Sequence, residues 1–502
     1  MLKTKNLHLK FLLAGIVLLA FILRFYNLET NPPGLYWDEV SNGYNAYSVL
    51  KTAKDEYGVF LPTVFRSYDD YKPPVYVYSI VPSIVIFGLN EFAVRFPSAI
   101  AGVLTVFLTY LISLKLFKKA KVALFASFFL AISPWHIQFS RGGFEANFMI
   151  FLTILGLYLF LQSKEKFYLL LLSAIVFGLA FNTYQGAKVW VPIFLLSAVF
   201  FMKEESSKHG KRIIFPFLIL ALFVLPVALN LNQSFIRGKS VSVFSQKGVN
   251  KTETFLKGYF SHFSPTFLFV KGDVIGRHSV PGMGELYVFQ LPLIFVGIYL
   301  LFKDKFKYRN FLIAWLILAP IPAALSSPVP HALRAITFIP LWSIICAYGL
   351  VFINKFNYQE KLTTLFIAGL FVVGLFNFIT YLHLYHKHYP KEKGPDWQDG
   401  YREMLNYVNQ AQDRYETIAI SDTLGRSYIY TLFYLKFDPA KYQAEGNQQG
   451  FDKFEFFKYS WQKKKPGKAL VVVSTREGAG PKILKDIHTY GEDVAFRIFE
   501  SE

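Results

Sequence analysis

The chain has 502 residues, of which 53% are hydrophobic and 18% aromatic, and its formal net charge at pH 7 is +19. A mean hydropathy of +0.33 and apolar runs that recur at the length of a bilayer crossing exclude an ordinary soluble protein. The basic residues lie mostly in short loops between apolar runs, so the charge does not indicate a nucleic-acid partner. Cys346 is the only cysteine, which excludes an intrachain disulfide. We therefore expect a polytopic membrane protein.

Apolar segments along the chain predict a bundle of about eleven spans. The first runs from Phe11 to Leu23 behind three lysines, as in a signal peptide, but no small-x-small cleavage site follows it. We therefore expect an uncleaved first span. The other ten lie near residues 93–114, 122–138, 144–162, 167–183, 187–202, 213–230, 286–302, 311–325, 333–353 and 362–383.

The apolar segment from Pro74 to Gly88 decides the topology. As a helix it would be about 22 Å long against a hydrocarbon core of about 30 Å, and Pro82 interrupts it. If it lies on or dips into the membrane surface, five basic loops fall on the side of the N-terminus, which the positive-inside rule assigns to the cytoplasm. These loops carry Lys115, Lys118, Lys119 and Lys121; Lys164 and Lys166; Lys203, Lys208, Lys211 and Arg212; Lys303, Lys305, Lys307 and Arg309; and Lys355 and Lys361.

The chemically distinctive segments then share the opposite, outer side of the membrane. Polar and ionisable residues that converge on one face of a helical bundle suggest a site there. The segments are the Leu35–Pro74 loop, the Ser140–Gly143 and Thr183–Gly186 turns, the Leu231–Glu285 loop, the Ser326–Arg334 turn and the tail from about Leu384.

The tail differs in composition from the bundle. Residues 396–411 and 426–435 have helical patterns, whereas 417–421 and 469–474 are typical of short buried strands. We expect a mainly α protein, with a transmembrane bundle at 1–385 that includes a catalytic outer loop at 27–92. A small extracytoplasmic α/β domain at 386–502, a lid or acceptor-docking module, follows it.

The acidic pair Asp38-Glu39 follows a Pro-Pro-Gly turn and opens a segment, Val40 to Leu50, with the amphipathic pattern of a helix on the membrane. A favourable contact with the helix dipole would explain the pair, and Trp37 suits an interfacial anchor. The functional interpretation is that Asp38 accepts the proton of an attacking hydroxyl, as a carboxylate fixed in a partly dry cleft can.

A second motif, Asp69-Asp70-Tyr71-Lys72-Pro73-Pro74, closes the same loop. A surface loop of mixed charge would look similar, but the pairing with Asp38 and Glu39 across a single loop favours function. Lys72 can hold a phosphate oxygen as a point charge, and Asp70 can position Lys72 or an acceptor.

Two arginines, Arg95 and Arg141, lie at the outer ends of predicted spans. Each could snorkel to lipid head groups. On the same side as the acidic loop, they also suit a lipid-linked phosphate, because guanidinium binds phosphate in a bidentate fork.

Further outer turns supply candidate substrate contacts, although helix capping would explain several of them. The candidates are Tyr184, Gln185, Arg277, His278, His331 and Arg334. His383, His386 and His388 lack a standard metal-ligand spacing, and no other cluster demands a metal. No cofactor is therefore predicted, although an acidic loop beside a phosphate could recruit a divalent cation.

The chain resembles the GT-C glycosyltransferases, in particular the branch of the dolichyl-phosphate-mannose-protein O-mannosyltransferases and the lipid A aminoarabinose transferases. The likeness spans roughly residues 7–385. Its motifs are Asp38-Glu39 after the first span, the Asp70-Tyr71-Lys72-Pro73-Pro74 step, Phe92-Ala93-Val94-Arg95-Phe96-Pro97-Ser98-Ala99 and Ser140-Arg141. Trp37 and Lys72 stand where the mannosyltransferases have histidines.

The resemblance implies an outward-facing active site in a prokaryotic cytoplasmic membrane, a polyprenyl-phosphate-linked sugar as donor, and a glycan, lipid or protein acceptor. It makes Asp38 the base, assisted by Glu39 and Asp70, and places Lys72, Arg95 and Arg141 near the lipid phosphate. The expected enzyme is a hexosyl- or pentosyltransferase that works by direct, inverting displacement, with cations stabilising the departing phosphate.

Two other classes of protein share parts of this pattern. A transporter or flippase for lipid-linked glycans would also have many spans, but transporters usually carry polar groups at mid-membrane and repeated halves. The predicted spans are nearly free of charge, and no internal duplication is visible. A non-catalytic glycan-binding protein of the same fold is a third reading, which the two carboxylate motifs disfavour.

Overall fold

The computed structural model describes residues 2–68, 70–245, 247–353, 360–458, 467–475, 477–478 and 482–501. Its contacts divide the chain into two compact units. The first unit comprises Met1–Tyr26, Tyr68–Val75 and Ser98–Leu384, and the second comprises Asn27–Ser67, Tyr76–Pro97 and Tyr385–Glu502. The second unit therefore combines the tail with residues 27–67 and 76–97, most of which belong to the predicted outer loop. The expected division into a membrane domain and an extracytoplasmic domain stays a prediction.

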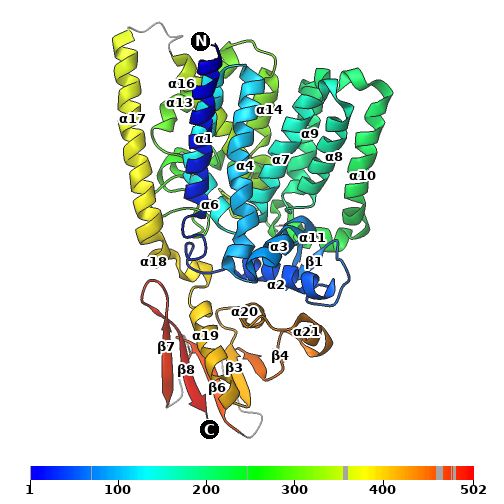
Figure 1. The fold of residues 1–502 in the computed structure, drawn as a ribbon, viewed down its shortest axis with the longest axis vertical. Helices are drawn as coiled ribbons and strands as arrows, with labels where there is room; N and C mark the ends of the chain where they lie inside the picture. Colours follow the sequence, from blue (N-terminus) through cyan, green and yellow to red (C-terminus); the bar gives the residue numbers. More distant parts are fainter. Residues whose placement is uncertain are drawn as a thin grey trace. The chain divides into compact units, whose positions relative to one another are not determined.

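The first unit is a bundle of apolar helices (Figure 1). They are α1 (Leu2–Phe25), most of α4 (Glu91–Phe117), α5 (Ala120–Ile132), α6 (Pro134–Arg141), α7 (Glu145–Gln162), α8 (Phe167–Phe181), α9 (Ala187–Phe201), α10 (Ile214–Leu229), α11 (Leu231–Val241), α12 (Lys251–Ser261), α13 (Gln290–Lys303), α14 (Arg309–Leu318), α15 (Ile321–Ala324), α16 (Ile339–Phe352) and α17 (Glu360–His383). The short strand β2 (Asp70–Lys72) also belongs to this unit.

The described residues include 5 helical stretches that are long and apolar enough to cross a membrane, namely Leu7–Phe25, Glu91–Phe117, Glu145–Glu165, Ser207–Leu229 and Glu360–Lys393. The pair α5 and α6, bent by 56°, would form a sixth span. The remaining predicted spans coincide with the shorter apolar helices Phe167–Phe181, Ala187–Phe201, Gln290–Lys303, Arg309–Ala324 and Ile336–Phe352. A polytopic helical bundle is thus confirmed, while the number of eleven spans stays a prediction.

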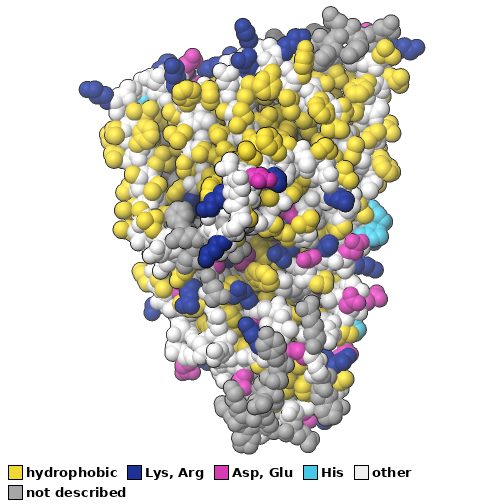
Figure 2. Space-filling model, turned by 180° about the vertical axis from the view of Figure 1, so that it is seen from behind, with side chains coloured by type: hydrophobic (Ala, Val, Ile, Leu, Met, Phe, Trp, Pro, Cys, Tyr) yellow, Lys and Arg dark blue, Asp and Glu magenta, His cyan; other side chains and the backbone are white. Residues whose placement is uncertain are grey.

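Basic loops of the first unit gather at one end of the bundle. Lys208 Nζ lies 2.6 Å from Glu165 Oε1, and Lys307 Nζ lies 2.6 Å from Glu205 Oε1. These ion pairs join the loops after α7, α9 and α13. Figure 2 shows Lys and Arg side chains at this upper end, above a wide apolar surface. Lys355 lies outside the described residues, and the membrane orientation stays a prediction.

Two arginines each cap the carboxyl end of a neighbouring helix in the first unit. Pro134 interrupts the helical path between α5 and α6, which leaves carbonyl groups at the end of α5 without helical partners. The guanidinium of Arg24 donates to the carbonyls of Leu130 at 3.2 Å and Ala131 at 3.1 Å. Arg141, the last residue of α6, donates to two carbonyls at the end of α1, at 2.9 and 2.6 Å. The two caps fix α6 against α1.

The second unit is an α/β structure. Its sheet has the order β4-β5-β3-β6-β8-β7, in which β3 runs parallel to β5 and β6 while β8 runs antiparallel to β6 and β7. The strands are β3 (Thr417–Ser421), β4 (Gly450–Phe451), β5 (Phe454–Phe457), β6 (Ala469–Ser474), β7 (Ile483–His488) and β8 (Val494–Ser501). The unit also contains β1 (Phe65–Ser67), α2 (Trp37–Thr52), most of α3 (Pro74–Phe87), α18 (Tyr389–Lys393), α19 (Tyr401–Ala411), α20 (Ser427–Tyr434) and α21 (Pro439–Glu445).

The sequence locates β3, β6 and α20 well, because each is a compact apolar segment between polar ones. The helix predicted from residue 396 begins only at Tyr401 as α19, since Gly400 has a φ of +99° that no helix accommodates. Helix α2 also differs from the expected amphipathic surface helix. It is buried along nearly its whole length, and it packs on the tail, where Tyr44 Oη donates to the Phe437 carbonyl at 3.1 Å.

Close packing of α13 on α16 generates a stability prediction. A Cβ atom added at Gly297 would overlap the carbonyl oxygen of Ile345, and one at Gly349 would overlap that of Leu293. We expect Gly297→Ala and Gly349→Ala each to lower the thermal unfolding temperature in detergent. The reason is overpacking, which typically lowers the free energy of unfolding by about 1–3 kcal/mol. Gly369→Ala in α17 is the matched control, because no atom lies within 4 Å of its added Cβ. Unchanged melting of both α13 and α16 variants would contradict this packing.

Candidate functional site

In the second unit, the first turn of α2 carries the acidic pair. Tyr36 is the N-cap residue, and Glu39 Oε2 accepts the Tyr36 backbone N–H at 3.2 Å, which closes a capping box. This bond directs Glu39 back into the protein. Asp38 precedes it in the same turn and is only partly buried. The two neighbouring carboxylates therefore occupy different environments.

Glu39 forms a fully buried ion pair with Arg95 of α4. Arg95 Nε lies 3.0 Å from Glu39 Oε1, and both side chains are 0% exposed. The other four N–H groups of Arg95 have acceptors as well, so all five donors of the guanidinium are engaged. These acceptors are Glu39 Oε2 at 3.4 Å and the carbonyls of Leu28 at 3.0 Å, Pro32 at 2.9 Å and Gly34.

This network fixes the backbone that leads into α2. Arg95 holds three carbonyls of the preceding turn, and its guanidinium lies 5.6 Å from the ring centroid of Trp397. A buried ion pair is tolerated when every remaining donor and acceptor is satisfied, and removal of one partner typically costs about 3–5 kcal/mol. Glu39 and Arg95 thus act as a structural pair that sets the position of Asp38.

In the first unit, the second predicted motif packs on the turn between α8 and α9. Gln185 Nε2 donates to the Tyr71 carbonyl at 2.7 Å, and Lys188 Nζ lies 2.5 Å from Gln185 Oε1. Asp70 acts electrostatically on Lys188. The structure therefore brings together the Asp70–Lys72 motif and the Thr183–Gly186 turn, which the sequence analysis selected separately. It adds Lys188, which lies in the first turn of α9. Asp69 lies outside the described residues.

Lys72 sits beside the start of α7. Its Nζ is 3.7 Å from Glu145 Oε1, and the two side chains are 10% and 11% exposed. A separation of 3.7 Å is at the loose end of ion-pair contacts, unlike the 3.0 Å contact between Arg95 and Glu39. Sequence analysis missed Glu145, although it directly follows the Ser140–Gly143 turn and Phe144.

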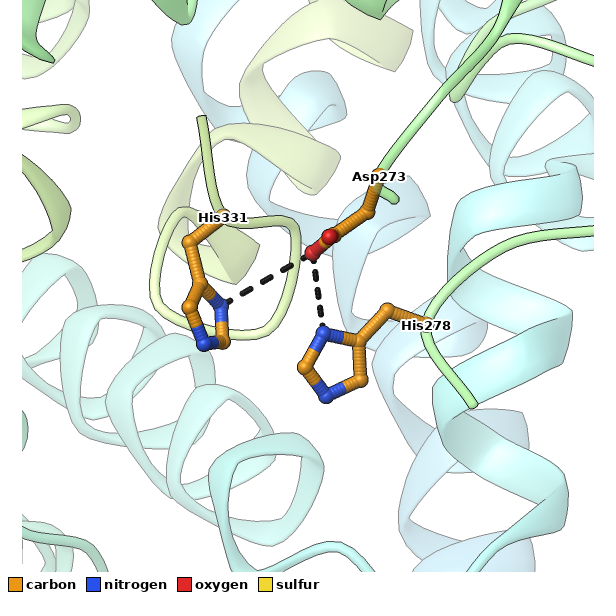
Figure 3. Close-up of side chains that lie close together, drawn as sticks. All are labelled: Asp273, His278 and His331. Carbon is orange, nitrogen blue, oxygen red and sulfur yellow. Dashed lines mark hydrogen bonds and ion pairs between the residues drawn. The ribbon is translucent and has the colours of Figure 1, made fainter. Parts of the chain in front are cut away.

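Two loops of the first unit converge on Asp273 (Figure 3). His278 Nδ1 lies 2.9 Å from Asp273 Oδ2, and His331 Nδ1 lies 3.8 Å from the same oxygen. Burial lowers the pKa of both imidazoles, more than the nearby carboxylate raises the pKa of His278, so both rings are neutral at pH 7. Burial and Asp273 together raise the pKa of Glu285, whose Oε1 accepts the Asp273 backbone N–H at 2.9 Å.

The turn between α6 and α7 links the two clusters of the first unit. Gln138 Nε2 of α6 donates to the Arg277 carbonyl at 2.8 Å, and the Phe144 ring lies 6.2 Å from the His278 ring. Glu145, the residue after Phe144, reaches Lys72. Arg141 lies in this turn, and Arg334 Nη1 donates to Ser326 Oγ and the Ser327 carbonyl, each at 2.9 Å. The first unit thus gathers most of the predicted site residues, while Asp38, Glu39 and Arg95 belong to the second.

Residues 15–241 match the family described as dolichyl-phosphate-mannose-protein mannosyltransferase. A Bacillus subtilis (strain 168) protein named "Putative mannosyltransferase YkcB" is 29% identical over 228 residues, which are 44% of this chain and 30% of that protein. The aligned stretches span between 30% and 39% of the length of the curated relatives.

Solved structures share the fold at low sequence identity. ArnT from Cupriavidus metallidurans in the apo state has a TM-score of 0.60 at 10% identity, over 99% of this chain and 98% of that chain. The same protein bound to undecaprenyl phosphate has a TM-score of 0.59 at 13% identity, over 97% of each chain. The Archaeoglobus fulgidus oligosaccharyltransferase AglB, in complex with an inhibitory peptide and a dolichol-phosphate, has a TM-score of 0.54 at 15% identity, over 86% of this chain and 64% of that chain. The family match over residues 15–241 and the shared architecture support membership of the GT-C superfamily of membrane glycosyltransferases.

Proposed function

We propose that this protein is an integral-membrane glycosyltransferase that moves a sugar from a polyprenyl-phosphate-linked donor to an acceptor hydroxyl. The acceptor would be a cell-envelope glycan, lipid or protein at the outer face of the cell membrane. The sugar is a hexose or a pentose. The observation that carries the proposal is Asp38, a partly exposed carboxylate held in place by the fully buried pair of Glu39 and Arg95.

Asp38 suits the role of general base better than its neighbour does. Glu39 has one oxygen in the capping box and the other on Arg95, so proton uptake by Glu39 would disrupt the turn. Asp38 takes part in neither of these two bonds, so proton uptake by Asp38 leaves the capping box and the pair with Arg95 intact.

Lys72 and Arg141 are the proposed contacts for the donor phosphate. Lys72 lies 3.7 Å from Glu145, and an incoming phosphate would compete with this carboxylate for the ammonium. Arg141 donates to two carbonyls at the end of α1, which fixes its guanidinium at the turn before α7. Arg95 was also predicted as a phosphate contact, but all five of its donors are engaged within the protein, and we propose a positioning role for it instead.

The proposed reaction is a single displacement. Asp38 takes the proton of the acceptor hydroxyl as its oxygen forms a bond to the anomeric carbon. The bond from that carbon to the phosphate oxygen breaks, the electron pair leaves with the polyprenyl phosphate, and the configuration of the carbon inverts. Lys72 and Arg141 stabilise the negative charge that grows on the departing phosphate, while Asp70 orients Lys72 or the acceptor.

The direct test uses purified full-length protein in detergent with a panel of polyprenyl-phosphate sugars. We expect release of polyprenyl phosphate that depends on both protein and acceptor. Movement of intact lipid-linked sugar across proteoliposomes without its release would overturn the proposal in favour of a flippase. Binding of a glycan without release of polyprenyl phosphate and without movement of lipid-linked sugar would favour a non-catalytic glycan-binding protein.

Substitution of Asp38 separates the base from the phosphate contacts. We expect Asp38→Asn to lower kcat by about 10²- to 10⁴-fold, the usual contribution of a positioned base, with the KM for the donor nearly unchanged. Lys72→Met is the comparison, because loss of a phosphate contact should also raise the donor KM. Turnover of Asp38→Asn at the wild-type rate would exclude Asp38 as the base.

A double-mutant cycle tests whether Glu39 and Arg95 act as one unit. Glu39→Gln and Arg95→Met each leave one buried charge uncompensated, so we expect each to lower both the thermal unfolding temperature and kcat. In the double variant the pair is neutral, so the loss of stability should be smaller than the sum of the losses of the two single variants. The expected coupling free energy is about 0.5–3 kcal/mol. Additive losses, or a rise in donor KM for Arg95→Met alone, would instead support a direct phosphate contact.

A further inference from the structure

The cluster of Asp273, His278 and His331 joins two loops that lie far apart in the sequence. The first loop connects residue 270 to α13, and the second connects α15 to residue 336. One ligand atom from each of the three side chains lies within 4.8 Å of the others (Figure 3). All three residues are at most 5% exposed.

These atoms have the spacing and chemistry of a metal site. Zinc is bound by imidazole nitrogen and carboxylate oxygen at about 2.0–2.2 Å, which places tetrahedral ligands about 3.4 Å apart. The distances of 2.9 and 3.8 Å from Asp273 Oδ2 to the two imidazoles bracket that value. Shifts of a few tenths of an ångström would therefore complete the geometry of three ligands.

The hydrogen bonds around the cluster favour a cation between these atoms. The Arg334 backbone N–H points to His331 Nδ1 at 3.4 Å, so this nitrogen carries a lone pair and not a proton. It faces Asp273 Oδ2, which is also an acceptor, at 3.8 Å. A cation between these two acceptors would bind both of them, beside the backbone N–H groups of Ala332 and Arg334 that they already accept.

The surroundings of Asp273 resemble the second shell of a metal ligand. Its Oδ1 accepts the Ile275 backbone N–H at 2.9 Å, and its Oδ2 accepts that of Ala332 at 2.7 Å, which fixes the orientation of the carboxylate. Glu285, which holds the Asp273 N–H through Oε1, has a buried Oε2 with no hydrogen-bond partner among the described residues.

We propose that Asp273, His278 and His331 bind a divalent transition-metal ion, with zinc as the expected ion and a water as the fourth ligand. Two imidazoles select against magnesium and calcium, which prefer oxygen ligands. The ion would fasten the two loops to each other and so hold Arg277 and Arg334 in position. This site does not depend on the proposed transferase activity.

The test is metal binding by tag-free full-length protein in detergent. After treatment with a chelator and dialysis, we expect about one equivalent of Zn²⁺ or Co²⁺ to bind per chain and to raise the thermal unfolding temperature. Bound Co²⁺ should show the visible absorption bands of a low-coordinate site, and Mg²⁺ should have no effect. A Co²⁺ spectrum like that of the aqueous ion, with no change in melting, would overturn the proposal and leave a hydrogen-bonded cluster.

Variants locate the ion. We expect His278→Ala, His331→Ala and Asp273→Asn each to abolish stoichiometric metal binding, whereas His488→Ala should bind as wild type. His488 is the matched control because it is an exposed histidine at the end of β7. Wild-type binding by the three cluster variants would place the metal elsewhere and overturn the assignment. If a variant fails to fold, the Co²⁺ spectrum of the wild-type protein still shows whether the protein binds the ion in a low-coordinate site.

Discussion

The entry into α2, where the proposed base Asp38 lies, depends on one buried ion pair. The chain is more than half hydrophobic, and a charge inside such a protein is costly unless a partner and hydrogen bonds compensate it. Glu39 and Arg95 meet this requirement completely, since five N–H donors meet two carboxylate oxygens and three carbonyls. The result is a rigid entry into α2 that presents Asp38 at its first turn. Neither residue needs to touch a substrate to be indispensable to the site.

The same principle operates at the turn between α5 and α6. Pro134 breaks the helical path and leaves carbonyl groups exposed to an apolar interior, where water cannot satisfy them. Arg24 and Arg141 supply the missing donors in opposite directions, one for α5 and the other for α1. Arg141 is thereby held at the turn that also carries Glu145. A single side chain can thus complete the backbone of a neighbouring helix in a membrane protein, because guanidinium has five donors in a fixed plane.

The sequence predicts the elements that local pattern determines. Apolar runs locate the helices of the bundle, and the compact apolar segments 417–421 and 469–474 are found as β3 and β6. It does not predict β7 or β8, whose mixed sequences become strands through pairing, nor the burial of α2, which comes from packing on the tail. Among the site residues, Lys72 and Gln185 are marked by their motifs. The Asp273 cluster is not, because His331 follows His278 by more than fifty residues and only the fold brings them together.

The proposed transferase needs cations that exchange a protein partner for a phosphate and others that never do. Distance and burial distinguish the two sorts in this chain. Arg95 lies 3.0 Å from a carboxylate with no exposure, so exchange of that partner would break two hydrogen bonds and leave the buried carboxylate uncompensated. Lys72 lies 3.7 Å from Glu145 with 10% of its side chain exposed, and an ammonium is a point charge that tolerates many geometries. A phosphate that displaced Glu145 would keep Lys72 charge-paired throughout binding and release. Arginine as the fixed partner and lysine as the exchangeable one therefore follow from the chemistry of the two side chains.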